Sequence, residues 1–293
     1  MLTRRVFGKW MAAGLGVSAL APEKFLVGQS PASVAAGFQF SVMMWALKSH
    51  GSFEENLERI AQAGYRHVEL VGEFKKWSEA DWQRILARMK TLGVTVDATT
   101  GVSTGFADPS GGDAFIAELK ELIPIAHRLQ ASQIILVSGK RIEGAAPGSQ
   151  HQASIDTLKR SVELLSAAGL VAVIEPIDRL ENPPIYLDGV TEAFEIVRAV
   201  GSPQVKVLYD FYHEQRTHGN LIEKLEKNFD QVGLVHIADV PGRHEPGTGE
   251  VNYINIYRKL KQLKYKGVIA MEFYPTGDVV QALRHAREEA MQA

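Results

Sequence analysis

Four residues with metal-binding side chains follow one another through the second half of the chain. They are Glu175, Asp210, His236 and Glu272, and they are separated by 35, 26 and 36 residues. Each lies in or at the end of a short apolar run, where an unpaired charged group is costly to bury. For any one of them a buried ion pair or a solvated strand end is an alternative. Four in succession, if they converge, favour a divalent cation such as Mn²⁺, Mg²⁺ or Co²⁺.

Convergence requires a fold that repeats at about this interval. From Phe38 onward, apolar runs rich in Val, Ile and Leu alternate with segments whose apolar residues recur every three or four positions. The expected strands are Gln39–Trp45, His67–Val71, Val94–Thr99, Gln133–Ser138, Val171–Pro176, Val205–Asp210, Gly233–Ala238 and Val268–Phe273. The expected helices are Phe53–Ala63, Ala80–Leu92, Ala114–Leu129, Ile155–Ala168, Val190–Val200, Leu221–Phe229, Ile254–Leu263 and Val279–Ala290.

Eight repeats of strand and helix predict an α/β fold, a (β/α)8 TIM barrel formed by residues 37–293. The rival fold, a doubly wound open sheet, requires a Gly-rich phosphate turn after its first strand. The residues at that place are Trp45-Ala46-Leu47-Lys48, which contain no glycine. Ser52 and Ser78 are expected to cap the helices that follow them. Left-handed helix ends are expected at five glycines, namely Gly64, Gly93, Gly169, Gly201 and Gly267.

The first 36 residues are predicted to be a sorting signal that is not part of the fold. Thr3-Arg4-Arg5-Val6-Phe7-Gly8-Lys9 resembles a bacterial twin-arginine (Tat) signal, and an apolar stretch, Trp10–Ala21, follows it. An ordinary basic signal with adjacent arginines is the alternative. The stretch is too short for a membrane span of about 20 apolar residues. The signal could be cleaved after Ala21 or after Ala35, or could remain as an uncleaved anchor. Export to the periplasm is expected.

Composition excludes several classes of protein. The chain has 293 residues, 45% of them hydrophobic and 23% charged, as is ordinary for a soluble enzyme. The formal net charge of −2 provides no bulk attraction to nucleic acid or anionic lipid, so no nucleic-acid partner is expected. There is no cysteine, which excludes disulfides, thiolate nucleophiles, zinc fingers and Fe–S clusters. Homo-oligomers remain open.

The later motifs resemble those of the xylose isomerase-like barrels, within the hydroxypyruvate isomerase and ketose 3-epimerase branch. The segment from Val235 to Tyr253, VHIADVPGRHEPGTGEVNY, is distinctive for this branch. Asp210-Phe211-Tyr212-His213 is similar to its D-x-x-H element, and Met271-Glu272-Phe273 to its last-strand glutamate. The similarity covers residues 38–293. His236 is the epimerase-like choice, since bacterial hydroxypyruvate isomerases carry glutamine at that position.

The resemblance implies roles for individual residues. Glu175, Asp210, His236 and Glu272 would bind one divalent metal, and Glu175 and Glu272 would also be the acid/base pair. Three further residues, His213, Arg243 and Glu181, would contact the substrate. A surface ion pair between Arg243 and Glu245 and a packed structural His213 are the alternatives. Weaker candidates for the same site are Glu69, Trp45, Phe106, Tyr212 and His244, and Glu69 could instead pair with His67 or Arg66.

The expected activity is isomerisation of a small sugar-like hydroxycarbonyl compound through an enediolate. A ketose 3-epimerase, or a lyase or deglycosylase, could use the same metal site. An apurinic-site endonuclease would need more histidines and a basic groove. A non-enzymatic, exported sugar-binding protein would be expected to lack one of the two glutamates, and this chain has both.

Overall fold

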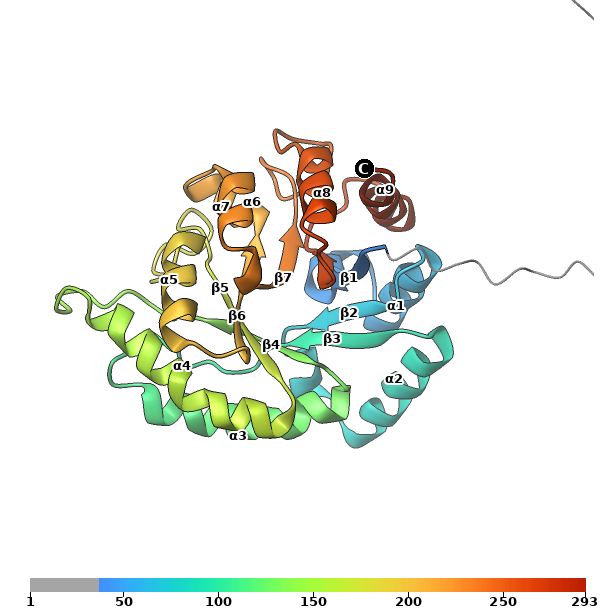
Figure 1. The fold of residues 1–293 in the computed structure, drawn as a ribbon. Coiled ribbons are helices and arrows are strands. Elements are labelled where there is room, and N and C mark those ends of the chain that lie inside the picture. Colours follow the sequence, from blue (N-terminus) through green and yellow to red (C-terminus); the bar gives the residue numbers. More distant parts are fainter. Residues whose placement is uncertain (1–36) are drawn as a thin grey trace, which may run out of the picture. The chain divides into compact units, whose positions relative to one another are not determined.

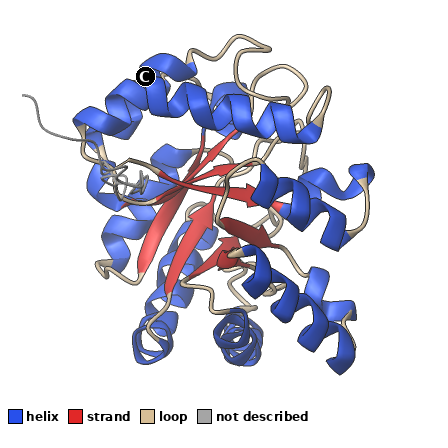
Figure 2. Cartoon of the chain, turned by 90° about the vertical axis from the view of Figure 1, so that its right-hand side faces the viewer, coloured by secondary structure: helices blue, strands red, loops and turns tan. Residues whose placement is uncertain are grey.

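The computed structural model describes residues 37–293. The predicted Tat signal and its cleavage sites lie outside the described residues. Eight parallel strands form a closed barrel in chain order, and β8 pairs with β1 (Figures 1 and 2). The predicted (β/α)8 barrel is therefore confirmed. The strands are β1 (Gln39–Met43), β2 (His67–Leu70), β3 (Thr95–Thr99), β4 (Gln133–Val137), β5 (Val171–Glu175), β6 (Val205–Asp210), β7 (Val232–Ile237) and β8 (Val268–Met271).

Helices connect successive strands and cover the outside of the barrel, as the ring of coiled ribbons in Figure 1 shows. None of the helices in residues 37–293 combines the length and apolar character needed to cross a bilayer. The α-helices are α1 (Phe53–Gln62), α2 (Glu79–Leu92), α3 (Gly112–Leu129), α4 (Ser149–Ala168), α5 (Val190–Val200), α6 (Phe211–Thr217), α7 (Leu221–Lys227), α8 (Tyr253–Gln262) and α9 (Val279–Gln292). Shorter 3-10 helices are η1 (Met44–His50), η2 (Glu73–Lys76) and η3 (Phe229–Gln231).

Two apolar regions hold the barrel together. The larger one lies between the strands and the surrounding helices. The smaller one fills the barrel interior with side chains from six different strands, as is typical of this fold. Its members are Met43, Ala98, Ile135, Val173, Leu208 and Leu234. These packed side chains lie beneath the carboxyl ends of the strands and hold the strands in place. The polar side chains at those ends therefore have fixed positions.

Most predicted helix ends are confirmed. Ser52 and Ser78 both form capping boxes, in which the serine hydroxyl accepts from the third residue of the helix. Gly93, Gly169 and Gly201 end their helices in the left-handed conformation. The prediction for Gly267 is wrong, because α8 ends five residues before it and the left-handed position falls at Lys264, with φ 57°.

Two local differences from the predicted elements affect the site. The first predicted strand continued to Trp45, but β1 ends at Met43 and the chain turns into η1. The sequence did not predict α6, which begins directly after Asp210. The Asp210 carboxylate accepts from the backbone amides of Tyr212 and His213, and so starts this helix.

Candidate metal centre

The four predicted metal ligands meet at the carboxyl ends of β5 to β8. Asp210 and His236 are opposite each other in the register between β6 and β7, and the Glu272 amide donates to the carbonyl of Ile237. Together with Glu175 these residues offer four ligand atoms that all lie within 4.8 Å of one another. All four side chains are buried. The residues that the sequence spaces by one repeat are therefore close enough to share one cation.

The two glutamates of this cluster lie in opposite electrostatic environments. Burial raises the pKa of Glu175 to about 7, and the negative charge of Glu272 adds to the rise. Burial acts on Glu272 in the same direction, but the charges of Arg243 and His236 outweigh it and hold its pKa well below the usual value. Near neutral pH Glu272 is therefore ionised while Glu175 can gain or lose a proton. Such a separation is typical of paired acid and base carboxyls.

The His236 imidazole contacts a carboxylate through each ring nitrogen. Nδ1 lies 2.7 Å from Oε2 of Glu272, and Nε2 lies 2.9 Å from Oε2 of Glu69. Burial acts to lower the pKa of His236, but the two carboxylates raise it well above its usual value. Because Glu272 belongs to the cluster and Glu69 does not, Nδ1 is the nitrogen that faces a cation held there.

The donor set fits a divalent cation. Three carboxylates and one imidazole are ligands that Mn²⁺, Mg²⁺ and Zn²⁺ accept. The raised pKa of Glu175 reflects burial beside another carboxylate, and a cation would relieve that repulsion. The cluster of Glu175, Asp210, His236 and Glu272 could therefore hold one metal ion.

Arg243 lies beside the cluster in the loop after β7. Its guanidinium is 2.7 Å from Oε2 of Glu272 and 2.6 Å from Oε1 of Glu181, and it lies over the ring of Trp45. Its backbone has φ 57°, which is uncommon outside glycine. The alternative pairing with Glu245 is wrong, because Glu245 hydrogen-bonds to the loop after β8. The arginine is buried and fixed toward the predicted metal site.

His213 lies on α6 next to the same carboxylates. Its Nδ1 is 2.7 Å from Oδ2 of Asp178, and its Nε2 is 3.5 Å from Oδ2 of Asp210 and 3.9 Å from Oε1 of Glu175. Burial acts to lower the pKa of His213, but the Asp210 charge and the Asp178 hydrogen bond raise it overall. The imidazole is therefore a hydrogen-bond donor held in a fixed orientation by Asp178.

A cavity of about 370 Å³ opens onto these groups. Five predicted site residues line it, namely Glu175, Glu181, His213, Arg243 and Glu272. Asp210 and His236 are in the cluster but are not among the cavity-lining residues. Trp45 also lines the cavity, and its indole donates to Oε1 of Glu272 at 3.1 Å. A small molecule in this cavity would contact both glutamates.

The weaker candidates are distributed differently. Glu69 reaches the cluster through His236 rather than pairing with a neighbour in sequence. Tyr212 lies against the guanidinium of Arg243, so it contacts the site indirectly. Phe106 is fully buried in the outer core and does not line the cavity. The ring of His244 hydrogen-bonds to a carbonyl in the loop after β8.

Two acidic residues that the sequence analysis missed organise the site, and a third lies inside the barrel. Asp178 orients His213, and Asp97 accepts a hydrogen bond from Ser41 inside the barrel. Asp239 accepts from four backbone amides between residues 240 and 251, and so folds the loop that carries Arg243. Asp97 interrupts an apolar strand, which is the signal that identified the four ligands. Asp178 and Asp239 each follow a predicted ligand by three residues.

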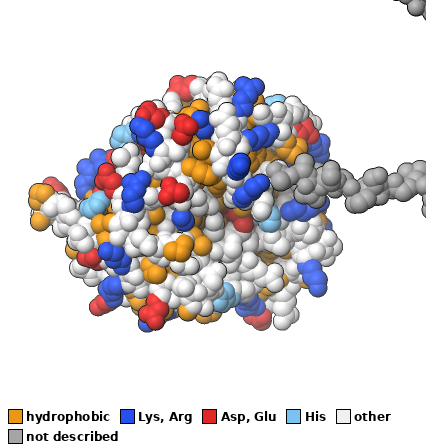
Figure 3. Space-filling model, viewed as in Figure 1, with side chains coloured by type: hydrophobic (Ala, Val, Ile, Leu, Met, Phe, Trp, Pro, Cys, Tyr) orange, Lys and Arg blue, Asp and Glu red, His pale blue; other side chains and the backbone are white. Residues whose placement is uncertain are grey.

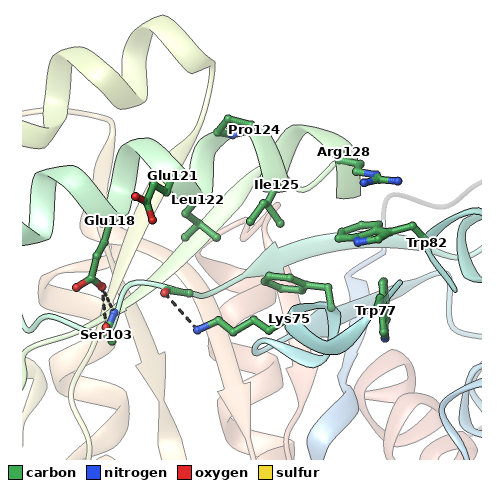
Figure 4. A pocket seen from close by; sticks show the side chains of 12 residues that line it. Lys75, Trp77, Trp82, Ser103, Glu118, Glu121, Leu122, Pro124, Ile125 and Arg128 are labelled. Carbon is green, nitrogen blue, oxygen red and sulfur yellow. Dashed lines mark hydrogen bonds between the residues drawn. The ribbon is translucent and has the colours of Figure 1, made fainter. Parts of the chain in front are cut away.

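A larger cavity, of about 640 Å³, lies between α2 and α3 on the outside of the barrel (Figure 4). Three of its four charged side chains already have partners. Lys75 donates to the carbonyl of Gly101, Glu118 accepts from Ser103, and Arg128 pairs with a glutamate of α2. Among residues 37–293 the groups that could hold a metal lie elsewhere. The smaller cavity is therefore the candidate active site.

The sequence matches the xylose isomerase-like TIM barrel family over residues 57–290, so the chain belongs to that family. It is 28% identical to hydroxypyruvate isomerase of Escherichia coli (strain K12) over 251 residues, which cover 84% of this chain and 97% of that protein. It is 25% identical to 2-oxo-tetronate isomerase of Haemophilus influenzae, with 84% and 96% covered. These homologues support an enzyme of the isomerase class.

A solved structure from Brucella melitensis, described as AP endonuclease, family 2, has a TM-score of 0.77 and is 24% identical. The match covers 84% of this chain and 96% of that chain, and it shows that the two share a fold.

Each group in residues 37–293 that could hold a metal contains a single histidine. On the face shown in Figure 3, acidic and basic side chains are interspersed. Neither feature favours binding to a nucleic-acid backbone.

The affinity for Mn²⁺ should increase with pH between about 6 and 8. A proton on Glu175, whose pKa is raised to about 7, competes with the metal, and so does the proton on His236. Below pH 7 the expected slope is on the order of tenfold per pH unit for each proton displaced. Titration calorimetry at several pH values measures it.

Glu195→Gln, an exposed change on α5, is the matched control and should show the slope of the wild type. An Mn²⁺ affinity that does not change with pH would contradict the assignment of Glu175 as a ligand.

Proposed function

We propose that this protein is a divalent-metal-dependent isomerase of the aldose–ketose type, similar to hydroxypyruvate isomerase. Its substrate is a small sugar-like hydroxycarbonyl compound, and Glu175 and Glu272 form its acid/base pair. The single observation that carries the proposal is that these two buried carboxyls line one cavity while their pKa values are shifted in opposite directions. One can hold a proton while the other accepts one.

The metal would be held by Glu175, Asp210, His236 and Glu272. When bound there, a divalent cation supplies Lewis-acid polarisation of neighbouring carbonyl and hydroxyl oxygens of a substrate. Glu272 is ionised near neutral pH and accepts the proton from the carbon beside the substrate carbonyl. Glu175 donates a proton to the former carbonyl carbon, while the proton of the neighbouring hydroxyl group moves to the former carbonyl oxygen. In the reverse reaction the two glutamates exchange roles.

The cavity walls supply the other functions. His213 and Arg243 are buried hydrogen-bond donors that would hold substrate oxygens, and Glu181 would accept from a substrate hydroxyl. Met43, Ile135 and other apolar side chains line the cavity wall and would exclude water from the carbon that loses its proton. Exclusion of water strengthens each charge–charge interaction in the site.

The substrate is proposed to carry a carboxylate next to its carbonyl group. Hydroxypyruvate and 2-oxo-tetronate, which are named for two relatives, both have this arrangement. Arg243 is the buried cation whose forked guanidinium matches a carboxylate. A 370 Å³ cavity also accommodates molecules larger than three carbons, so the length of the substrate stays open.

Ketose 3-epimerisation is the second candidate function. The same proton removal gives an epimer if the proton returns to the opposite face of the same carbon. The histidine at position 236, which the ketose 3-epimerases share, favours this alternative. A lyase or deglycosylase would start from the same proton removal and then lose a neighbouring group.

Export through the Tat pathway to the periplasm is part of the proposal. It is supported by Arg4-Arg5 with Phe7 and Lys9 in the sequence. The Tat system moves folded proteins, so the metal could be bound before export.

Glu175→Gln and Glu272→Gln should each lower turnover by at least about 10²-fold, because a positioned acid or base typically contributes 10²–10⁴-fold. Both changes keep the size of the side chain but remove its proton-transfer function. Hydroxypyruvate, 2-oxo-tetronate and ketohexoses are incubated in D₂O with Mn²⁺. The carbon that gains deuterium distinguishes isomerisation from epimerisation.

The exposed change Glu195→Gln should leave turnover and deuterium incorporation as in the wild type. Deuterium incorporation by Glu175→Gln or Glu272→Gln within about tenfold of the wild type would overturn the acid/base assignment. Such a loss is smaller than the contribution of a positioned acid or base.

Arg243→Lys should raise KM for a carboxylate-bearing substrate by about tenfold or more, because a charged hydrogen bond contributes roughly 1.5–3 kcal/mol. A ketose without a carboxylate should show a smaller increase in KM. Arg258→Lys, an exposed change on α8, is the matched control. Equal KM changes for both kinds of substrate would argue against carboxylate recognition by Arg243.

A further inference from the structure

A buried carboxylate lies behind the metal-binding histidine, on the opposite side of the barrel. Glu69 is on β2, its side chain is fully buried, and its Oε2 is 2.9 Å from Nε2 of His236. The two atoms are in close contact, and neither they nor Oε1 of Glu69 form a hydrogen bond with any other described residue. The imidazole is therefore the polar group that faces this carboxylate.

The strand register explains why Glu69 points inward at this level. Between β2 and β3, Val68 pairs with Val96 while Glu69 pairs with Ala98, so Asp97 is an extra residue in a bulge. Such bulges are frequent next to active sites, where they redirect side chains. Asp97 points into the barrel and accepts from the hydroxyl of Ser41 at 2.5 Å. Among the described residues Asp97 forms no hydrogen bond or ion pair with His236, although the side chains of Asp97 and Glu69 are both buried.

A purely structural ion pair explains this arrangement poorly. Burying two charged groups costs several kcal/mol for each ion, and apolar replacements of such pairs are often neutral or stabilising. The neighbouring interior positions on other strands are apolar, for example Ile135, Val173 and Leu208. The carboxylate therefore provides something that an apolar side chain in the barrel interior does not.

We propose that Glu69 is a positioning residue that accepts the Nε2–H of His236 and so presents Nδ1, unprotonated, to the metal. The proposal deepens the proposed function and rests on the metal centre assigned there. A neutral imidazole carries its proton on one nitrogen, and a metal binds the other. A carboxylate at Nε2 selects the tautomer that leaves Nδ1 free, fixes the ring plane and increases the basicity of the ligand.

The test compares three variants by their Mn²⁺ dissociation constants at one pH. Glu69→Met keeps the length of the side chain but removes the acceptor, and should weaken binding by about 10–100-fold. Glu69→Gln keeps an acceptor oxygen and should lose less affinity than Glu69→Met. Asp97→Asn changes a buried carboxyl group that forms no hydrogen bond or ion pair with His236. Its Mn²⁺ affinity should stay within about threefold of the wild type, which is less than the loss expected when a hydrogen-bond partner of a metal ligand is removed.

The second readout is the tautomer of His236, measured by ¹⁵N NMR in metal-free and Zn²⁺-loaded protein. The resonance is assigned with His236→Gln. The wild type and Asp97→Asn should show the proton on Nε2 in the Zn²⁺-loaded form, and metal-free Glu69→Met should show a mixture or a shift to Nδ1–H. Circular dichroism establishes that each variant is folded before binding is compared.

Different outcomes would contradict the metal centre and the role of Glu69. A wild-type protein that binds no divalent metal would overturn both the metal centre and the role of Glu69. Normal Mn²⁺ affinity and an unchanged tautomer in folded Glu69→Met would overturn the role of Glu69 alone. Equal losses in Glu69→Met and Asp97→Asn would also overturn it, because changing any buried carboxyl group in the barrel would then have the same effect as removing the contact with His236.

Discussion

The structure depends on one electrostatic constraint, the crowding of carboxylates around a single buried imidazole. The ligand atoms of Glu175, Asp210, Glu272 and His236 lie close enough together to bind one cation. Glu69 contacts the other ring nitrogen of His236. Such crowding in a dry interior is unfavourable unless positive charge is nearby. The positive charges of Arg243 and His236 offset this negative charge only in part, because each of the two side chains contacts more than one carboxylate. A bound metal would satisfy the remaining negative charge. The raised pKa of Glu175 reflects burial and the neighbouring charge of Glu272, whereas Arg243 and His236 lower the pKa of Glu272.

The barrel makes this crowding possible because it fixes the geometry before any ligand arrives. Parallel strands with a packed interior hold the four side chains at one rim. The loop after β7 is folded around Asp239, which lets Arg243 extend across the rim to Glu272. Asp178 holds His213 in the same way. A chain of buried acceptors therefore orients each group that would touch a substrate, and few side chains at the site are free to rearrange.

The sequence predicted the barrel and the four clustered residues because both depend on a repeating signal. Apolar runs mark the strands, and a polar residue at the same place in each repeat marks the rim. Features that depend on contacts across the fold were harder to predict. Asp97 reaches the interior through a bulge, and the short helix α6 is started by Asp210 itself. Glu69 contacts a residue on a strand far away in sequence, so the sequence alone did not decide between a position at the site and pairing with His67 or Arg66.

Anomalous diffraction from crystals soaked in Mn²⁺ tests the metal centre most directly. The expected result is one strong peak, with oxygen atoms of Glu175, Asp210 and Glu272 and Nδ1 of His236 at about 2.0–2.3 Å. Nε2 of the same histidine should remain directed to Glu69. A peak elsewhere in the molecule, or none at these four side chains at saturating Mn²⁺, would contradict the assignment of the cluster as a metal site.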